Sequence, residues 1–251
     1  MKYRSIFSYY GGKSKLAARY ASPRHDLILE PFAGGAAYSL LYHERMVKLN
    51  DLDSLTFGAW SFLLQKDALD LVQQHVPRTI NRGDNIYDLV NADCPAGLIT
   101  LMRAAAAPGS FGAKGIRKQV TPWGSRAWHR LIPRLEYWIP KISHWSVTNV
   151  DFSLMPNDQG QWFIDPPYAN VAGSDYRTGG INYMSLAAWC RARHGSVIVC
   201  ENAGAAWLPF TPFSTRAGCM TSRPLAAKHA GHEVLWERTG PRYSLSQTAS
   251  K

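Results

Sequence analysis

The sequence of 251 residues has no run of about 18 or more apolar residues, which a membrane-spanning helix would need. Its first residues also lack the long apolar core of a secretory signal, so we expect a cytoplasmic protein. The four cysteines show neither C-x-x-C spacing nor histidines at zinc-finger offsets. Reduced thiols and no metal site are therefore expected.

Acidic residues are scarce, and none occurs between Asp93 and Glu136. Lys and Arg number 28 against 18 Asp and Glu, which gives a net charge of +10. Phe111, Trp123 and Trp128 are interleaved with basic residues in the acid-free stretch. Basic side chains neutralise phosphates and aromatic rings stack on bases, so this clustering favours a nucleic-acid surface over a solvated loop with a few core tryptophans. The candidate contacts are Lys114, Arg117, Lys118, Arg126 and Arg130.

Short apolar runs separated by helical patterns predict an open α/β sheet that is mostly parallel. These runs cover residues 27–30, 46–49, 145–150, 162–164, 196–200 and 233–238. Acidic residues stand at the ends of five runs, and ligands of such sheets bind at the carboxyl ends of the strands. We therefore expect one edge of the sheet to carry Glu30, Asp51, Asp151, Asp165 and Glu201.

The runs that end at Asp51 and Asp151 lie 100 positions apart, which is too far for one crossover helix. Between them come a helical pattern over residues 55–76, a polar turn at 81–84 and the acid-free stretch. The sequence thus predicts two parts. We expect residues 1–55 and 142–251 to form a catalytic domain. Residues 56–141 would form an inserted region, mainly of helices and loops, that recognises the nucleic-acid target.

The tetrapeptide Asp165-Pro166-Pro167-Tyr168 directly follows an apolar run. An exocyclic amine on an aromatic base is a poor nucleophile because its lone pair is delocalised into the ring. A carboxylate and a backbone carbonyl on a stiff proline turn can accept its two N–H hydrogens and draw the nitrogen toward pyramidal geometry. Tyr168 can stack on the extracted base. The alternative is a proline-rich turn without chemistry.

Two glycine-rich segments come earlier in the chain. Residues 30–35 (Glu-Pro-Phe-Ala-Gly-Gly) separate an apolar run from a helical pattern, and their glycines would let the backbone approach a cofactor. They do not form the G-x-G-x-x-G fingerprint of a dinucleotide site. Residues 7–13 (Phe-Ser-Tyr-Tyr-Gly-Gly-Lys) fail the phosphate-loop spacing but could hold a carboxylate through Lys13. Asp51 is placed either to bind ribose hydroxyls or to cap a helix.

In this order, the motifs Phe-Ser-Tyr-Tyr-Gly-Gly-Lys, Glu-Pro-Phe-Ala-Gly-Gly, Asn-Asp and Asp-Pro-Pro-Tyr closely resemble those of the Dam-type adenine-N6-specific DNA methyltransferases of the α group. The resemblance runs from Tyr3 to about Arg238. It implies a Rossmann-like S-adenosylmethionine-dependent methyltransferase sheet with an inserted target-recognition region. One departure is Gly34-Gly35-Ala36, where Gly-x-Gly is more usual.

The resemblance also implies roles for the matching residues. Asp165 and the Pro166 carbonyl would orient the acceptor amine, followed by Pro167, and Tyr168 would stack on the flipped base. The loop over residues 169–183 would close over that base and add Tyr176 and Arg177 to the DNA contacts. The residues implied to bind the cofactor are Tyr10, Gly11, Gly12, Lys13, Glu30, Pro31, Phe32, Gly34, Gly35, Asp51, Asp151, Phe152 and Asp165.

The sequence thus predicts a monomeric, site-specific enzyme that methylates adenine N6 in double-stranded DNA by base flipping, with S-adenosyl-L-methionine as the methyl donor. Three alternatives stay open: a cytosine-N4 DNA methyltransferase, an adenine-N6 RNA methyltransferase, and a catalytically silent nucleic-acid-binding protein on the same fold. Asp165 favours adenine, because cytosine-N4 enzymes more often carry Ser at that position. An NAD-dependent oxidoreductase is not supported, because the sequence lacks the G-x-G-x-x-G fingerprint of that class and such an enzyme would have no use for the tetrapeptide.

Overall fold

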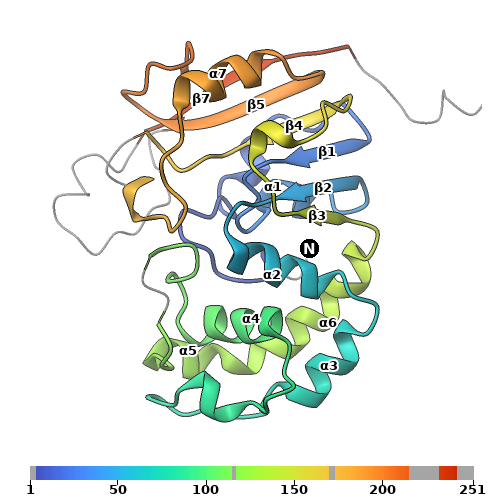
Figure 1. The fold of residues 1–251 in the computed structure, drawn as a ribbon, viewed down its shortest axis with the longest axis vertical. Coiled ribbons are helices and arrows are strands. Elements are labelled where there is room, and N and C mark those ends of the chain that lie inside the picture. The colour runs from blue at the N-terminus through green and yellow to red at the C-terminus, as the bar shows by residue number, and fades with distance from the viewer. Residues whose placement is uncertain (1–3, 115–116, 170–172, 215–231, 242–251) are drawn as a thin grey trace, which may run out of the picture.

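The computed structural model of the protein describes residues 4–114, 117–169, 173–214 and 232–241. In these residues seven strands form one mixed sheet in the order β3-β2-β1-β4-β5-β7-β6 (Figure 1). The first five strands of this order are parallel, whereas β7 runs antiparallel to both β5 and β6. The predicted α/β fold is confirmed at this level. The strands are β1 (Leu27–Glu30), β2 (Met46–Asn50), β3 (Ser146–Thr148), β4 (Gly160–Ile164), β5 (Gly195–Asn202), β6 (Thr211–Ser214) and β7 (Glu233–Arg238).

Seven α-helices accompany this sheet in the described residues. In Figure 1, α7 lies along β5 and β7 at one end of the molecule, and α3 to α6 gather at the other end. Short 3-10 turns join the larger elements, including one at Gly173–Asp175. The helices are α1 (Ala37–Leu41), α2 (Ser54–Leu63), α3 (Ala68–His75), α4 (Ala96–Ala106), α5 (Pro122–Ala127), α6 (Leu131–Ile142) and α7 (Tyr183–Arg191).

The central strands are buried on both faces, as expected for parallel strands covered by helices. Along β4, Trp162 and Ile164 pack into one hydrophobic cluster with Leu186 of α7, while Phe163 points to the other face. There Phe163 stacks on Tyr38 of α1, with ring centroids 4.4 Å apart. The continuous apolar runs in the sequence reflect this two-sided burial.

The structure departs from the expected elements in two places. The helical pattern over residues 55–76 forms two helices, α2 and α3, because the polar segment 65–67 lets the chain turn so that α3 packs on α6. The edge strand β6 was not predicted from the sequence. It contains Pro212, whose missing N–H is tolerated only where no neighbour needs a hydrogen bond.

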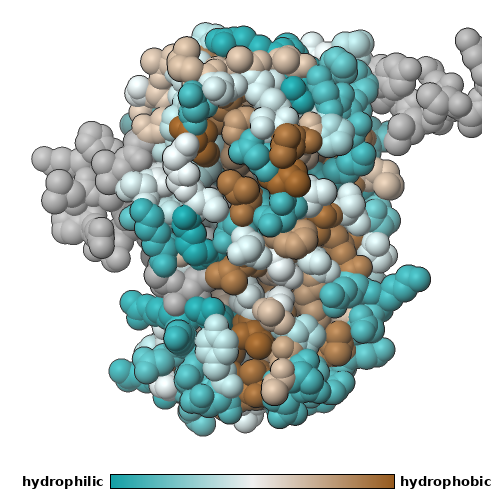
Figure 2. All heavy atoms as spheres, viewed as in Figure 1, coloured by the Kyte–Doolittle hydropathy of each residue, from teal (hydrophilic) through white to brown (hydrophobic). Residues whose placement is uncertain are grey.

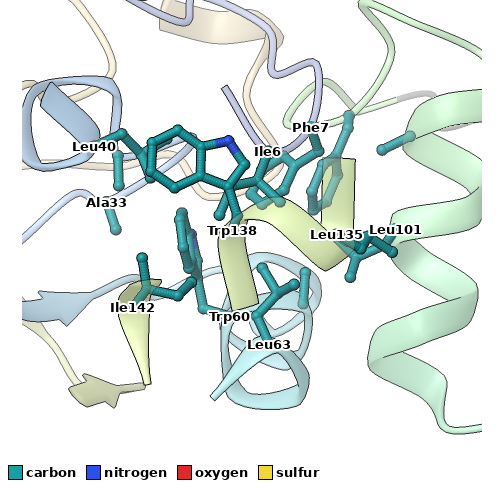
Figure 3. Packing of buried hydrophobic residues seen from close by; sticks show 14 of the residues in the cluster. Ile6, Phe7, Ala33, Leu40, Trp60, Leu63, Leu101, Leu135, Trp138 and Ile142 are labelled. Atoms are coloured by element: carbon teal, nitrogen blue, oxygen red, sulfur yellow. The ribbon is translucent and has the colours of Figure 1, made fainter. Parts of the chain in front are cut away.

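The predicted insert and the sheet share one hydrophobic core (Figure 3). Trp60 of α2, Leu101 of α4 and Trp138 of α6 belong to the same buried cluster as Ile28 of β1 and Leu40 of α1. The boundaries expected at residues 55/56 and 141/142 fall inside α2 and α6. The division into a catalytic domain and a recognition insert stays a prediction, and the helices in question pack as part of the main body.

Hydrophilic side chains are prominent at the margins of the helical end in Figure 2, while hydrophobic ones lie nearer the middle of that face. Within the described ranges, the helices are all too short or too polar to cross a membrane. Cys94, Cys190 and Cys200 are free and buried, and Cys219 lies outside the described residues.

Candidate functional site

A cavity of about 450 Å³ lies at the carboxyl ends of β1, β2 and β4. Strand β1 pairs with β2 on one side and with β4 on the other, so the strand order reverses here. Open α/β sheets bind ligands at such a switch point. Four of the five acids expected at this edge line the cavity, namely Glu30, Asp51, Asp151 and Asp165.

Every residue that the sequence motifs assign to the cofactor lines this one cavity. These residues come from segments far apart in the chain: the N-terminal stretch, the turns after β1 and β2, the turn after β3 and the end of β4. The fold thus brings the separate sequence motifs together in a single site. The residues are Tyr10, Gly11, Gly12, Lys13, Glu30, Pro31, Phe32, Gly34, Gly35, Asp51, Asp151, Phe152 and Asp165.

Aromatic side chains form part of the cavity lining. The ring of Phe152 lies 5.6 Å from that of Phe32 and 5.3 Å from that of Trp189, measured between centroids. Ile181 lines the same cavity. Trp189 was missed by the sequence reasoning because it sits on α7, outside any motif. This lining suits a flat apolar ring, and the carboxylates elsewhere in the cavity suit polar or cationic groups.

The glycine-rich turn admits a neighbouring aromatic ring. Gly34 has φ of +46°, and a Cβ there would lie 2.8 Å from the Tyr9 ring, which also lines the cavity. Ala36, at which this turn departs from the Gly-x-Gly of the methyltransferases that its sequence resembles, adopts φ of +44°. This left-handed conformation costs an L-residue roughly 1–2 kcal/mol. The departure from the usual pattern therefore falls at a strained position.

Asp51 is held by the backbone on both of its carboxylate oxygens. Gly34 N donates to Oδ2 at 2.8 Å and Asp53 N donates to Oδ1 at 2.9 Å. Burial raises the pKa of Asp51 to about 7, although these two hydrogen bonds oppose the rise. The helix-cap alternative does not apply to Asp51, since Asp53 caps α2 by accepting from Leu55 N. Each Asp51 oxygen has a second lone pair with which to accept from a ligand hydroxyl.

Glu30 is almost completely buried at the end of β1. Its Oε1 accepts hydrogen bonds from the backbone N and the hydroxyl of Ser39, at 2.8 and 2.5 Å. Burial raises the pKa of Glu30 to about 8 despite these bonds. Glu30 thus joins the turn after β1 to the start of α1.

Asp165 forms an ion pair with Lys13. The Lys13 ammonium lies 2.9 Å from each Asp165 oxygen, and the side chains are only 10% and 20% exposed. Burial alone would lower the pKa of Lys13, but the neighbouring Asp165 carboxylate raises it, and the pKa lies well above its ordinary value. Lys13, expected to lie near the carboxylate of a ligand, here contacts the first residue of the tetrapeptide.

Tyr168 is directed inward in this structure. Its hydroxyl is buried and has no hydrogen-bond partner among the residues that the structure describes, and its ring centroid lies 4.7 Å from Lys13 Nζ. Burial raises the pKa of Tyr168 well above its ordinary value. The ring packs against the main core, whereas Asp165 and Pro167 line the cavity. Stacking of Tyr168 on a base stays a prediction.

Two residues outside the motifs fix the turn that carries the tetrapeptide. The Tyr183 hydroxyl donates to the Pro167 carbonyl at 2.7 Å. Glu201, expected to line the edge of the sheet, is instead fully buried and accepts from Ala169 N at 3.0 Å and from Trp207 Nε1 at 3.0 Å. These contacts come from α7, β5 and the segment after β5, so no local motif could have predicted them.

The residues expected to form a basic and aromatic surface are partly exposed and partly buried. Lys114, Arg117, Lys118, Arg126 and Arg130 are all exposed, as binding of phosphates requires. Of the three interleaved aromatics, Trp123 is 66% exposed, whereas Phe111 and Trp128 are buried in the core. Their expected role as base contacts is wrong for the latter two in this structure, because Phe111 packs against Phe7 in the main core and Trp128 is buried with its Nε1 donating to the Pro77 carbonyl.

The segment before α7 is attached to the body of the protein. Arg177 pairs with Asp53 and donates to the Ala113 carbonyl, and the Tyr176 hydroxyl donates to the Tyr10 carbonyl at 3.3 Å. Both side chains were expected to contact DNA, and the structure places them in internal contacts. The DNA role assigned to them stays a prediction.

No group of three or more His, Cys, Asp or Glu residues that could hold a metal ion occurs in the part of the chain that the structure describes. Comparisons with models of protein families and with curated proteins found no match to this chain.

Proposed function

We propose that this protein is an S-adenosylmethionine-dependent methyltransferase that acts on adenine N6 in double-stranded DNA, and that its sheet is the Rossmann-like sheet of that enzyme class. One observation carries the proposal: the residues of four separate sequence motifs line a single cavity at the switch point of the sheet, with Asp165 among them.

The residues of the cavity fit the proposed cofactor. Phe32, Phe152 and Trp189 offer an apolar surface to an adenine ring, and Asp51 offers carboxylate oxygens to ribose hydroxyls. The carboxyl oxygens that line the same cavity carry negative charge, partial where the group is protonated and full where it is ionised, and so favour a positive sulfonium centre. The cofactor would supply an electrophilic methyl group, so the protein needs only to bind, orient and exclude water.

Asp165 is the residue assigned to the acceptor amine. Its carboxylate stands at the end of β4, and Lys13 fixes its orientation through both oxygens. A carboxylate in this place can accept an N–H of an exocyclic amine and direct the nitrogen lone pair toward the methyl donor. Tyr183 and Glu201 hold the backbone on either side of Tyr168, which keeps the turn in place.

Duplex DNA is the proposed partner because the exposed basic residues of the acid-free stretch can neutralise phosphates. The exposed Trp123 beside Arg126, with the guanidinium carbon 5.9 Å from the ring centroid, adds an aromatic surface for a base or sugar. Arg117 and Lys118 also line a second, open cavity of about 530 Å³ together with Arg82.

The proposal is tested by incubating the protein with unmethylated plasmid DNA and S-adenosylmethionine that carries a labelled methyl group. Mass spectrometry then identifies the modified nucleosides. We expect labelled N6-methyladenine, and we expect Asp165→Ala to reduce transfer by roughly 100-fold or more. Asp158→Ala is the matched control, since Asp158 also pairs with a lysine, Lys48, but does not line the cavity.

Each other result would change the assignment. Label in N4-methylcytosine would move the acceptor to cytosine, and label in RNA alone would move it to RNA. No label in any nucleic acid would favour a silent binding protein. An Asp165→Ala variant as active as the Asp158→Ala control would remove the proposed mechanism.

A further inference from the structure

Arg177 occupies a nearly enclosed place between three parts of the chain. Its side chain is 18% exposed, and that of Asp53 is 8% exposed. The guanidinium meets Asp53 with two nitrogens: Nε donates to Oδ1 at 3.2 Å, and Nη2 donates to Oδ2. Nη1 donates to the Ala113 carbonyl at 2.9 Å. This is the forked, two-point pairing that a guanidinium makes with a carboxylate and that a lysine ammonium does not reproduce.

The segment that Arg177 anchors forms one wall of the cavity. Thr178, Gly179, Gly180, Ile181 and Asn182 all line it. Figure 1 shows the chain before α7 running from the sheet toward the helical end of the molecule. Nothing in the motifs explains why this wall should be attached at Arg177.

Further contacts beside Arg177 hold the same segment to the N-terminal motif and to the predicted insert. Lys114 N donates to the Asp175 carbonyl at 2.9 Å, and Ala113 forms an isolated β-bridge with Tyr176. The Tyr10 hydroxyl donates to Asp175 Oδ2 at 3.3 Å. The wall is thus attached both to Tyr10 of the N-terminal motif and to residues 113–114 of the predicted insert.

Asp53 connects this wall to the candidate ribose site. Its backbone N donates to Asp51 Oδ1, while its side chain caps α2 by accepting from Leu55 N and from the Thr56 hydroxyl. Three hydrogen bonds thus hold Asp53 in place in addition to its pairing with Arg177. A displacement of Asp53 would also move the N–H that orients Asp51.

We propose that Arg177 is a positioning residue that clasps segment 173–182 to Asp53 and so couples the wall of the cavity to the Asp51 carboxylate. The ligand side of this inference rests on the proposed function, because it takes the cavity as the cofactor site. The contacts of Arg177 with Asp53 and with the Ala113 carbonyl do not depend on that assignment. Its role is to complete the cofactor pocket, in contrast to a direct contact of Arg177 with DNA.

The test compares Arg177→Gln, Asp53→Asn and the double variant, and Asp53→Asn keeps an oxygen that can cap α2. Hydrogen exchange of peptides covering residues 173–182 is measured without ligand, and the affinity for S-adenosylhomocysteine is measured by calorimetry. We expect faster exchange in that segment and roughly tenfold weaker binding for each single variant, with little further loss in the double variant.

Two further variants serve as controls. Arg45→Gln removes an arginine that pairs with an aspartate, Asp26, away from the cavity, and it should change neither measurement. Arg177→Lys keeps the charge but not the fork, so it should fold and still show part of the effect. Thermal unfolding shows whether each variant remains folded, and Arg177→Lys replaces Arg177→Gln in the comparison if the latter does not.

The outcomes separate the clasp from the proposed function. Unchanged exchange in segment 173–182 would overturn the clasp. Faster exchange with unchanged affinity, or strictly additive losses in the double variant, would overturn its coupling to Asp51. If the wild-type protein does not bind S-adenosylhomocysteine, the proposed cofactor is wrong, and the exchange measurement alone then decides whether Arg177 clasps the segment.

Discussion

At the residue scale, the cavity concentrates carboxyl groups that the fold keeps away from water. Glu30 and Asp51 stand at the ends of neighbouring strands; Asp51 accepts from two backbone N–H groups, and Glu30 accepts from the backbone N–H and the hydroxyl of Ser39. Asp165 has the Lys13 ammonium instead. The two kinds of partner have different consequences, because an ammonium balances a full charge, whereas N–H dipoles offset only part of the cost of burying one.

This difference predicts how stability depends on pH. The pKa of Asp51 rises from an ordinary value of 3.8 to about 7 on folding, chiefly through burial. A carboxyl whose folded-state pKa is raised stabilises the fold while protonated, and this contribution is lost as the pH rises from about 4 through about 7. Since one pKa unit is worth about 1.4 kcal/mol, Asp51→Asn should gain at least about 1 kcal/mol relative to wild type between pH 5 and pH 8.5.

Urea unfolding of the ligand-free protein at these two pH values measures the change. Asp158→Asn is a suitable control, because Asp158 is partly exposed and pairs with Lys48 outside the cavity. A difference between Asp51→Asn and wild type that is the same at both pH values would show that Asp51 is ionised throughout this range.

At the element scale, α2 and α4 approach each other through two glycines. A Cβ at Gly97 of α4 would lie 2.2 Å from the Gly58 carbonyl oxygen and 2.6 Å from Phe62 Cβ. We expect Gly97→Ala to destabilise the protein by roughly 1–3 kcal/mol, because the helices cannot separate without opening the core. Thermal or urea unfolding provides the measurement.

Gly58 supplies the matched substitution on the facing helix. A Cβ there would meet no atom of the described residues within 4 Å outside the backbone of its own helix, so Gly58→Ala should stabilise α2 by up to about 1 kcal/mol through helix propensity. If both substitutions to alanine stabilise the protein, the close packing of α2 on α4 is not as the structure shows it.

The elements that sequence patterns predicted well are those whose burial is regular along the chain. β1 and β7 occupy the predicted ranges, since their apolar runs are bounded by turn residues. The division of residues 55–76 into α2 and α3 and the edge strand β6 depend on packing between distant elements. No periodicity within these segments could have revealed those contacts.

The residues of the candidate site also fall into two groups, those that local motifs predict and those that only the packing of distant elements brings to the site. Local motifs predicted Lys13, Asp51 and Asp165, and the structure brings them to one cavity. The partners that hold the site in place, such as Glu201 under Ala169, come from other elements and carry no motif. Sequence patterns also assigned Phe111 to a surface. An aromatic residue among basic residues has the same sequence pattern whether its side chain is exposed or buried, so the pattern could not predict the burial of Phe111.

At the scale of the whole molecule, charge is distributed unevenly. The net charge is +10, and the stretch between Asp93 and Glu136 supplies basic residues without any acid. Five basic side chains of this stretch are exposed, namely Lys114, Arg117, Lys118, Arg126 and Arg130, while the carboxyl groups of the cavity lie at the edge of the sheet. A polyanion would therefore be attracted to one region of the protein more than to the rest.

This arrangement predicts the salt dependence of DNA binding. Each phosphate contact that is lost should reduce the slope of log affinity against log salt by about 0.9, so Arg117→Gln/Lys118→Gln should lower it by roughly 1 to 2. Arg24→Gln/Lys66→Gln removes the same charge from exposed residues outside the acid-free stretch and should leave the slope nearly unchanged. Fluorescence anisotropy with a labelled duplex at several salt concentrations measures both. Equal slopes for the two double variants would mean that net charge, and not this surface, governs binding.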